Sequence, residues 1–241
     1  MYPISRSSAY DRAITMFSPD GRLYQVEYAS KILEKVALGF GVVYKEGVLL
    51  AGDKSITSSL IKPDSIEKLF KIDDHVGAVS AGIVGDARRL VQMAREEAQE
   101  NRMYYEEPIH IETLVKRISS IKQMFTQFGG GRPFGVAFII GGVDETGPRV
   151  FETEPSGALA EYTAVAIGKN KDKVLQLFEK QYRDGMDREE AIKLVLNGLK
   201  AGLEKDEKFI PKNIDFAFIE EKTGFQKIPV SLIESIVKKM K

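Results

Sequence analysis

Apolar residues recur three or four positions apart in several long stretches of the chain, which is the spacing of one face of a helix. Asp187 and Glu190 mark the start of one such stretch, because their spacing is that of a capping box. The pattern predicts helices over residues 22–34, 84–103, 111–128, 170–184, 188–204 and 232–240.

Shorter apolar runs bounded by Gly, Pro, Asp and Lys predict strands. Lys45-Glu46-Gly47 separates two of these runs and indicates a hairpin, and Lys222-Thr223-Gly224 separates the last two in the same way. The runs cover residues 37–44, 48–53, 55–61, 75–81, 134–143, 149–154, 162–168, 214–220 and 225–228.

The order of these elements predicts the fold class. Strands come in separate blocks, and a pair of helices follows each of the first two blocks, which argues against alternating strands and helices in a parallel sheet. Strands that are apolar on both faces need cover on both sides. We therefore predict an α+β fold, a four-layer α-β-β-α sandwich, in one domain covering residues 1–241. The helix over residues 22–34 is extra to that sandwich.

Composition excludes several classes of function. Lys plus Arg is 35 and Asp plus Glu is 35, so no excess charge draws the chain to nucleic acid or to an anionic membrane. The chain has no cysteine and two histidines, which excludes a thiolate site and a multi-histidine metal site, and we expect no cofactor. No apolar run reaches the roughly 18 residues of a membrane span, and the first residues do not resemble a signal peptide. The expected location is the cytoplasm.

The sequence offers little evidence for catalytic groups. The glycine-rich residues 129–135 follow a predicted helix and precede a predicted strand, the reverse of a phosphate-binding loop. We interpret them as a flexible connection that leaves Arg132 free for a partner. His75 and His110 are expected to be surface or capping residues. Neither a Gly-x-Ser-x-Gly nor a His-Glu-x-x-His motif is present.

The amino-terminal third carries the most specific motif. It consists of Tyr10-Asp11-Arg12 and the run Phe-Ser-Pro-Asp-Gly-Arg-Leu-Tyr-Gln-Val-Glu-Tyr-Ala over residues 17–29. Together with further motifs, this run closely resembles the α subunits of the proteasome, in their archaeal form. The further motifs lie at residues 65–68, 81–88, 130–135, 151–157 and 166–168.

The resemblance implies a sandwich of the N-terminal-nucleophile hydrolase type. It also implies a non-catalytic α subunit of the proteasome core particle, whose extra helix packs neighbouring subunits together in a heptameric ring. The catalytic β subunits of that family use an N-terminal threonine, but here the corresponding strand begins near Ala37 with a helix in front of it. The alternative that remains open is an active peptidase of the N-terminal-nucleophile type.

The resemblance also implies a gate to the proteolytic chamber. Residues 1–12 are expected to form a mobile gate segment, since they show no apolar periodicity. Tyr10, Asp11, Pro19 and Tyr28 would form the cluster that holds the open conformation. Protein substrates would pass this gate on their way to the β subunits.

A second implied site docks the activator, a regulatory AAA ATPase that binds through its C-terminal tails. Lys68 would pair with the terminal carboxylate of the tail, and Gly82 and Ile83 would leave room for its backbone. Glu27 resembles the position that contacts bound activators. Arg132 is expected to contact the neighbouring protomer of the ring.

Overall fold

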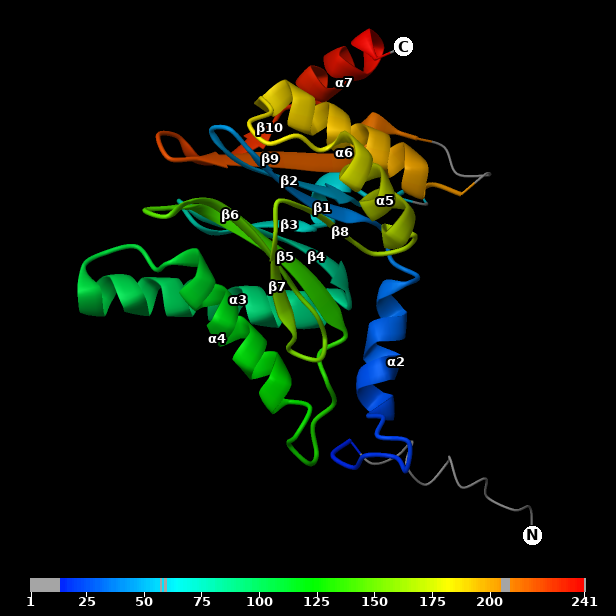
Figure 1. Cartoon of the computed structure of the whole chain (residues 1–241), viewed down its shortest axis with the longest axis vertical. Coiled ribbons are helices and arrows are strands. Elements are labelled where there is room, and N and C mark those ends of the chain that lie inside the picture. The colour runs from blue at the N-terminus through cyan, green and yellow to red at the C-terminus, as the bar shows by residue number, and fades with distance from the viewer. Residues whose placement is uncertain (1–13, 57, 59, 205–208, 241) are drawn as a thin grey trace.

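Two five-stranded antiparallel sheets lie face to face between two helical layers (Figure 1). The structure is a computed structural model and describes residues 14–56, 58, 60–204 and 209–240. The first sheet has the order β10 (Gly224–Ile228), β9 (Ile214–Glu220), β2 (Gly47–Asp53), β1 (Gly39–Tyr44), β8 (Ala164–Ile167). The second has the order β3 (Leu69–Asp73), β4 (Val76–Gly82), β5 (Val136–Asp144), β6 (Gly147–Thr153), β7 (Leu159–Tyr162).

Helices cover the outer faces of both sheets (Figure 1). The second sheet is covered by α3 (Val84–Tyr105) and α4 (Ile111–Met124), and the first by α5 (Lys171–Gln181), α6 (Arg188–Gly202) and α7 (Val230–Lys239). Helix α2 (Tyr24–Leu33) stands beside the sandwich. Single turns of 3-10 helix occur at Pro63–Ser65 and Pro211–Asn213. The predicted four-layer sandwich with an extra amino-terminal helix is confirmed.

The interior between the sheets is apolar and closely packed. Leu50, Val79 and Ile139 are fully buried there. Strand β1 reaches this interface through Gly41, since a Cβ atom at that position would lie 2.5 Å from Cγ2 of Ile139. Both faces of the central strands are therefore covered, as their continuous apolar sequences require.

The predicted hairpins and the capping box are confirmed. Strands β1 and β2 pair from Gly39↔Gly52 to Tyr44↔Gly47. At the start of α6, the Asp187 carboxylate accepts a hydrogen bond from the Glu190 amide at 2.8 Å, and the Asp187 amide donates to the Glu190 carboxylate at 3.1 Å. These reciprocal bonds satisfy two amides that would otherwise lack a partner at the helix start.

The strand predicted over residues 55–61 is wrong. The described residues of that segment form no strand, Ser55 has a φ of 42°, and Leu60 is 91% exposed. The strand lies further along, at β3, where Leu69, Phe70 and Ile72 are buried. Serine and threonine make up most of residues 55–61, so that segment has no continuous apolar face to bury.

The single strand predicted over residues 162–168 is two strands. Strand β7 pairs with β6 in the second sheet, whereas β8 pairs with β1 in the first. Thr163 lies between them, and its carbonyl already accepts a hydrogen bond from Val43 of the first sheet at 2.8 Å. The chain therefore crosses from one sheet to the other within a run whose local pattern looks continuous.

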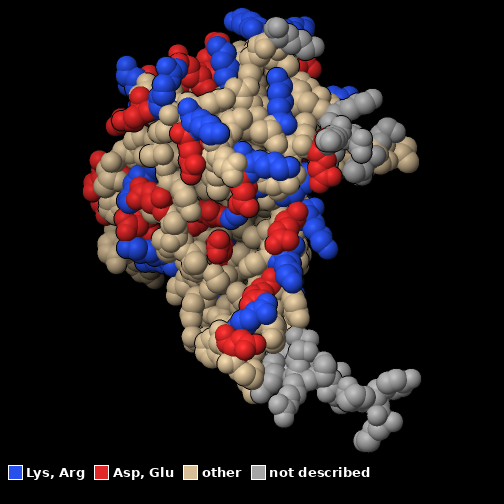
Figure 2. Space-filling model, turned by 45° about the vertical axis from the view of Figure 1, so that its right-hand side comes forward, with Lys and Arg blue, Asp and Glu red and all other residues tan. Residues whose placement is uncertain are grey.

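Charged side chains of both signs are mixed over the face that Figure 2 shows, as the zero net charge leads us to expect. Within the described residues, no helix is long and apolar enough to cross a bilayer.

Candidate functional site

A pocket with a volume of about 280 Å³ lies beside the segment that enters β1. Ala37 lines it from that segment, Glu67 and Lys68 from the residues before β3, Gly82 from the end of β4, and Arg88 from α3. The pairing of β3 with β4 brings these elements together, because the Ser80 amide donates to the Lys68 carbonyl at 3.0 Å. The structure thus places Lys68 beside Gly82, as expected.

The Lys68 ammonium group is the central cation of the pocket. Its Nζ atom donates a hydrogen bond to the Ala37 carbonyl at 2.7 Å. Burial lowers the pKa of Lys68 to about 8, and nearby Asp53 opposes that change. An ammonium has three donors, and in the part of the chain described here only Ala37 accepts from this one. Lys68 is therefore charged at neutral pH and can donate to an anion that enters the pocket.

Gly82 forms a wall of the pocket that admits no side chain. Its φ is 138°, and a Cβ atom there would lie 2.2 Å from the Gly135 carbonyl oxygen. Ile83 follows, and its amide donates to the same carbonyl at 2.9 Å. The Ile83 side chain packs against Gly135 and does not line the pocket, so only Gly82 of this pair stands next to Lys68.

Arg132 is not free, which corrects the prediction for the glycine-rich connection. Its guanidinium forms two hydrogen bonds with the Asp86 carboxylate, at 2.6 and 2.7 Å, and the Gly135 amide donates to the same carboxylate at 2.8 Å. Burial opposes ionisation of Asp86, but these donors prevail and hold the pKa of that carboxyl below its ordinary value. The connection is thereby tied to the first turn of α3. The Arg132 side chain stays 57% exposed.

Helix α2 carries the other predicted site residues. Glu27 accepts from Nε of Arg22 at 2.7 Å. Tyr28 stacks on Tyr24 with ring centroids 6.3 Å apart, and Pro19 is exposed just before the helix. Glu27 and Tyr28 do not line the Lys68 pocket. The predicted gate residues Tyr10 and Asp11 lie outside the described residues.

The start of β1 lacks the groups of an N-terminal nucleophile. Such a catalyst needs a hydroxyl or thiol side chain and a free amine on the same residue. Ala37 offers a methyl group, its nitrogen belongs to a peptide bond, and Lys68 binds its carbonyl. The preceding carbonyl is also engaged, since the Lys169 amide donates to Val36 at 2.9 Å.

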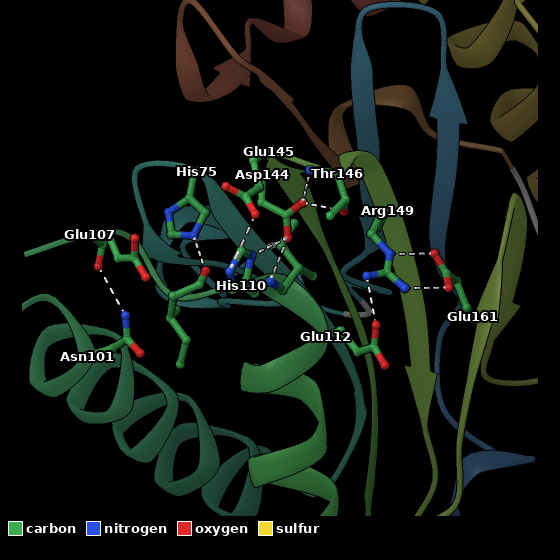
Figure 3. A network of polar contacts seen from close by, with 12 residues as sticks. His75, Asn101, Glu107, His110, Glu112, Asp144, Glu145, Thr146, Arg149 and Glu161 are labelled. Atoms are coloured by element: carbon green, nitrogen blue, oxygen red, sulfur yellow. Dashed lines mark hydrogen bonds and ion pairs between the residues drawn. The ribbon is translucent and has the colours of Figure 1, made fainter. Parts of the chain in front are cut away.

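The histidines lie at the other end of β5, in the network of Figure 3. His75 is largely buried, because its side chain is 15% exposed and its Nε2 donates to the Ile109 carbonyl at 2.8 Å. The expectation of a surface or capping residue is wrong for His75. His110 is 44% exposed and makes no side-chain cap. The cap of α4 is Asp144, which accepts from the Ile111 amide at 3.0 Å.

Asp86, Asp144 and Arg88 were not identified from the sequence. Asp86 and Asp144 form hydrogen bonds with residues far away in the sequence, so local spacing carries no signal for them. Arg88 belongs to the motif at residues 81–88, but nothing in that motif shows which element its side chain meets. No group of acidic or histidine side chains among the described residues could hold a metal ion.

Comparison with known proteins agrees with this geometry. A family model described as "Proteasome subunit" matches residues 37–219, and a model of the N-terminal signature of α-type proteasome subunits matches residues 10–31. The chain is 51% identical to the proteasome α subunit of Methanothermobacter thermautotrophicus, over 91% of this chain and 88% of that protein. It is 50% identical to the corresponding protein of Methanocaldococcus jannaschii, over 97% of this chain and 88% of that one. The chain therefore belongs to the family of proteasome subunits, in its α type.

Proposed function

We propose that this chain is a non-catalytic α subunit of the proteasome core particle and works in the cytoplasm. It forms heptameric outer rings on the β subunits, gates the entry of protein substrates, and docks regulatory ATPases for ATP-dependent degradation. The observation that carries this proposal is the segment that enters β1, where a nucleophile would stand. Ala37 there is an internal residue with a methyl side chain, held by Lys68.

The exposed apolar surface around α2 supports the ring. Ala29 is buried, but most of the other apolar side chains of this helix are partly open to solvent. Phe17, just before the helix, is 66% exposed. Exposed apolar surface of this kind is typical of a protein interface. Arg132 is exposed on the neighbouring connection and keeps the proposed role of a ring contact, now held in place by Asp86.

The test of the non-catalytic role is direct. We expect the purified chain to hydrolyse no fluorogenic peptide, because it lacks a nucleophile with a free amine. Co-expression with β subunits should give rods with peptidase activity and with rings of this chain at both ends in electron micrographs. Turnover by the chain alone would favour the alternative, an active peptidase.

The gate gives a prediction for the assembled core. Deleting residues 2–9 should raise peptide hydrolysis, because a plug over the entry is removed while the β-subunit sites are untouched. Rates on the deleted and full-length cores would be compared with the same short peptide. The matched control is a deletion core whose β subunits are inactivated, which should show no activity. Equal rates on the two cores with active β subunits would show that residues 2–9 do not block the entry. The gate role proposed for the cluster would then be wrong as well.

Glu27 gives a second prediction. Its ion pair with Arg22 is exposed, so it contributes little to stability, and Glu27→Ala should leave the ring intact. Stimulation of peptide hydrolysis by an added activator should fall, since a surface carboxylate near the entry is lost. Glu34→Ala, at the other end of the same helix, is the control and should respond as the unmodified core does. If Glu27→Ala is stimulated as strongly as Glu34→Ala, Glu27 does not contact the activator.

A further inference from the structure

Three basic residues of the described chain line the Lys68 pocket, and they are engaged very differently. Lys54 is buried and forms an ion pair with Asp215, with Nζ and Oδ1 2.9 Å apart. Lys68 donates to the Ala37 carbonyl. The Arg88 side chain is exposed and, among the described residues, forms no hydrogen bond or ion pair. One cation of the pocket is therefore wholly available.

The surroundings of Arg88 do not neutralise it. Asp86, two residues earlier on α3, is already bonded to Arg132 and to the Gly135 amide. Within the described part of the chain, Glu67 is the one carboxylate that lines the pocket. Its single negative charge is fewer than the two positive charges of Lys68 and Arg88. Lys54 is balanced by Asp215, and Asp53 acts on Lys68 from outside the lining, so among the described residues that line the pocket Lys68 and Arg88 face only Glu67. An anion is the ligand that such a charge favours.

The size of the pocket limits what the anion can belong to. Its volume of about 280 Å³ is just below the range of about 300–1,000 Å³ that small-molecule sites occupy. Gly82 adds backbone and no side chain to the wall, because a Cβ atom there would meet the Gly135 carbonyl oxygen. The pocket thus suits the last residues of an extended peptide. A guanidinium also matches a carboxylate through two parallel hydrogen bonds, which a lysine cannot make.

We infer that Arg88 is the second cation of the docking pocket and binds, together with Lys68, the carboxylate end of the partner's tail. This inference rests on the docking function proposed above. Arg88 acts as a specificity residue, because it selects a free chain end over an amidated or internal segment. Arg89 follows on α3, is also exposed, and does not line the pocket. It is therefore the matched control.

The experiment uses the assembled core particle. The probe is a fluorescent peptide of the last eight residues of the cognate regulatory ATPase, with a free terminal carboxylate, beside the same peptide as its terminal amide. Anisotropy titrations would be run on the unmodified core and on Arg88→Gln, Arg89→Gln, Arg88→Lys and Lys68→Ala cores. We expect Arg88→Gln to weaken binding of the free acid about tenfold and Arg88→Lys to recover part of it. Arg89→Gln should change it less than about twofold, and the amide should bind weakly to every core.

The outcomes separate the inference from the function on which it rests. If Lys68→Ala loses binding and Arg88→Gln behaves as Arg89→Gln does, the role of Arg88 is wrong and docking stands. If acid and amide bind all five cores equally, docking at this pocket is wrong and the inference falls with it. A last titration adds inorganic phosphate to the core with the free-acid peptide bound. If phosphate at the concentration of the peptide displaces it, the pocket is a general anion site, and the role of Arg88 in recognising a chain end is wrong.

Discussion

Replacing Lys122 by alanine is expected to lower the free energy of unfolding by about 3–5 kcal/mol. This lysine is fully buried in α4. Its Nζ atom donates to the carbonyls of Val136 and Thr153, each at 3.1 Å, and to the Thr153 hydroxyl at 2.6 Å. Alanine would remove all three hydrogen bonds, leave the Val136 carbonyl without this donor and open a cavity in the layer beneath the helix. Each unsatisfied buried acceptor alone costs about 1–3 kcal/mol.

The place of Lys122 explains why so much depends on it. The pairing of β5 with β6 ends at Phe138↔Thr153, so Val136 lies beyond the last pair. The ammonium group bonds the strand ends where the ladder stops. It thereby fixes α4 to both strands at the point where the connection from α4 enters β5.

The same lysine predicts a pH dependence. Burial lowers the pKa of Lys122 from an ordinary value of 10.5 to about 7, although Glu152 and Glu154 oppose that change. Between those two values the unfolded chain holds a proton that the folded chain does not. Stability should therefore rise with pH across that window and be level below it. Lys122→Met should flatten this rise, so its deficit relative to the unmodified chain narrows as the pH falls to 7.

Chemical denaturation of the isolated rings at pH 7 and 9.5 would measure both effects. Lys116→Ala is the control, because Lys116 lies on the exposed face of the same helix and pairs only with Glu112 among the described residues. It should cost less than about 1 kcal/mol. A loss of that small size for Lys122→Ala, or the same pH slope for Lys122→Met as for the unmodified chain, would contradict the account.

The internal position of Lys122 could be predicted from the sequence, but its hydrogen-bond partners could not. Ile111, Val115, Ile118 and Lys122 follow one another at spacings of three and four, so the lysine continues the buried stripe of α4. The spacing is a signal that the position is internal. It does not name the acceptors, because Val136 and Thr153 come from strands that only the tertiary fold brings there.

The fold was predictable wherever the pattern was local. Apolar periodicity and turn residues define most helices and hairpins, and the order of blocks defines the layers. The prediction of one strand over residues 162–168 fails because the two halves of that run pair with different sheets, which local periodicity cannot show. The site divides in the same way. The family motif pointed to Lys68 and Gly82, whereas the bond of Arg132 to Asp86 joins residues 46 positions apart.

Lys68→Ala is expected to weaken binding of an activator's C-terminal tail by about 10- to 100-fold per site. A charge-assisted hydrogen bond from a partly desolvated ammonium to a carboxylate contributes roughly 1.5–3 kcal/mol, and each 1.4 kcal/mol is a factor of about ten. Gate opening by the ATPase, or by its C-terminal peptide, should then be lost. The ring should survive, because the Ala37 carbonyl that loses its donor lies at the pocket and can be hydrated.

The charge of Lys68 makes this binding depend on pH in a definite direction. Because burial lowers the pKa of Lys68 to about 8, the free pocket carries its charge below that pH and loses it above. Tail affinity in the unmodified core should therefore hold from pH 6 to 7 and fall as the pH rises past 8, whereas the Lys68→Ala core should show no such fall.

Lys71→Ala is the control, since Lys71 lies on β3 outside the pocket and pairs with Asp74. The Lys71→Ala core should bind the peptide as the unmodified core does. Basal hydrolysis by a gate-deleted core should be the same with either substitution. An affinity that is unchanged in Lys68→Ala, or that falls with pH just as steeply there, would show that the terminal carboxylate binds elsewhere.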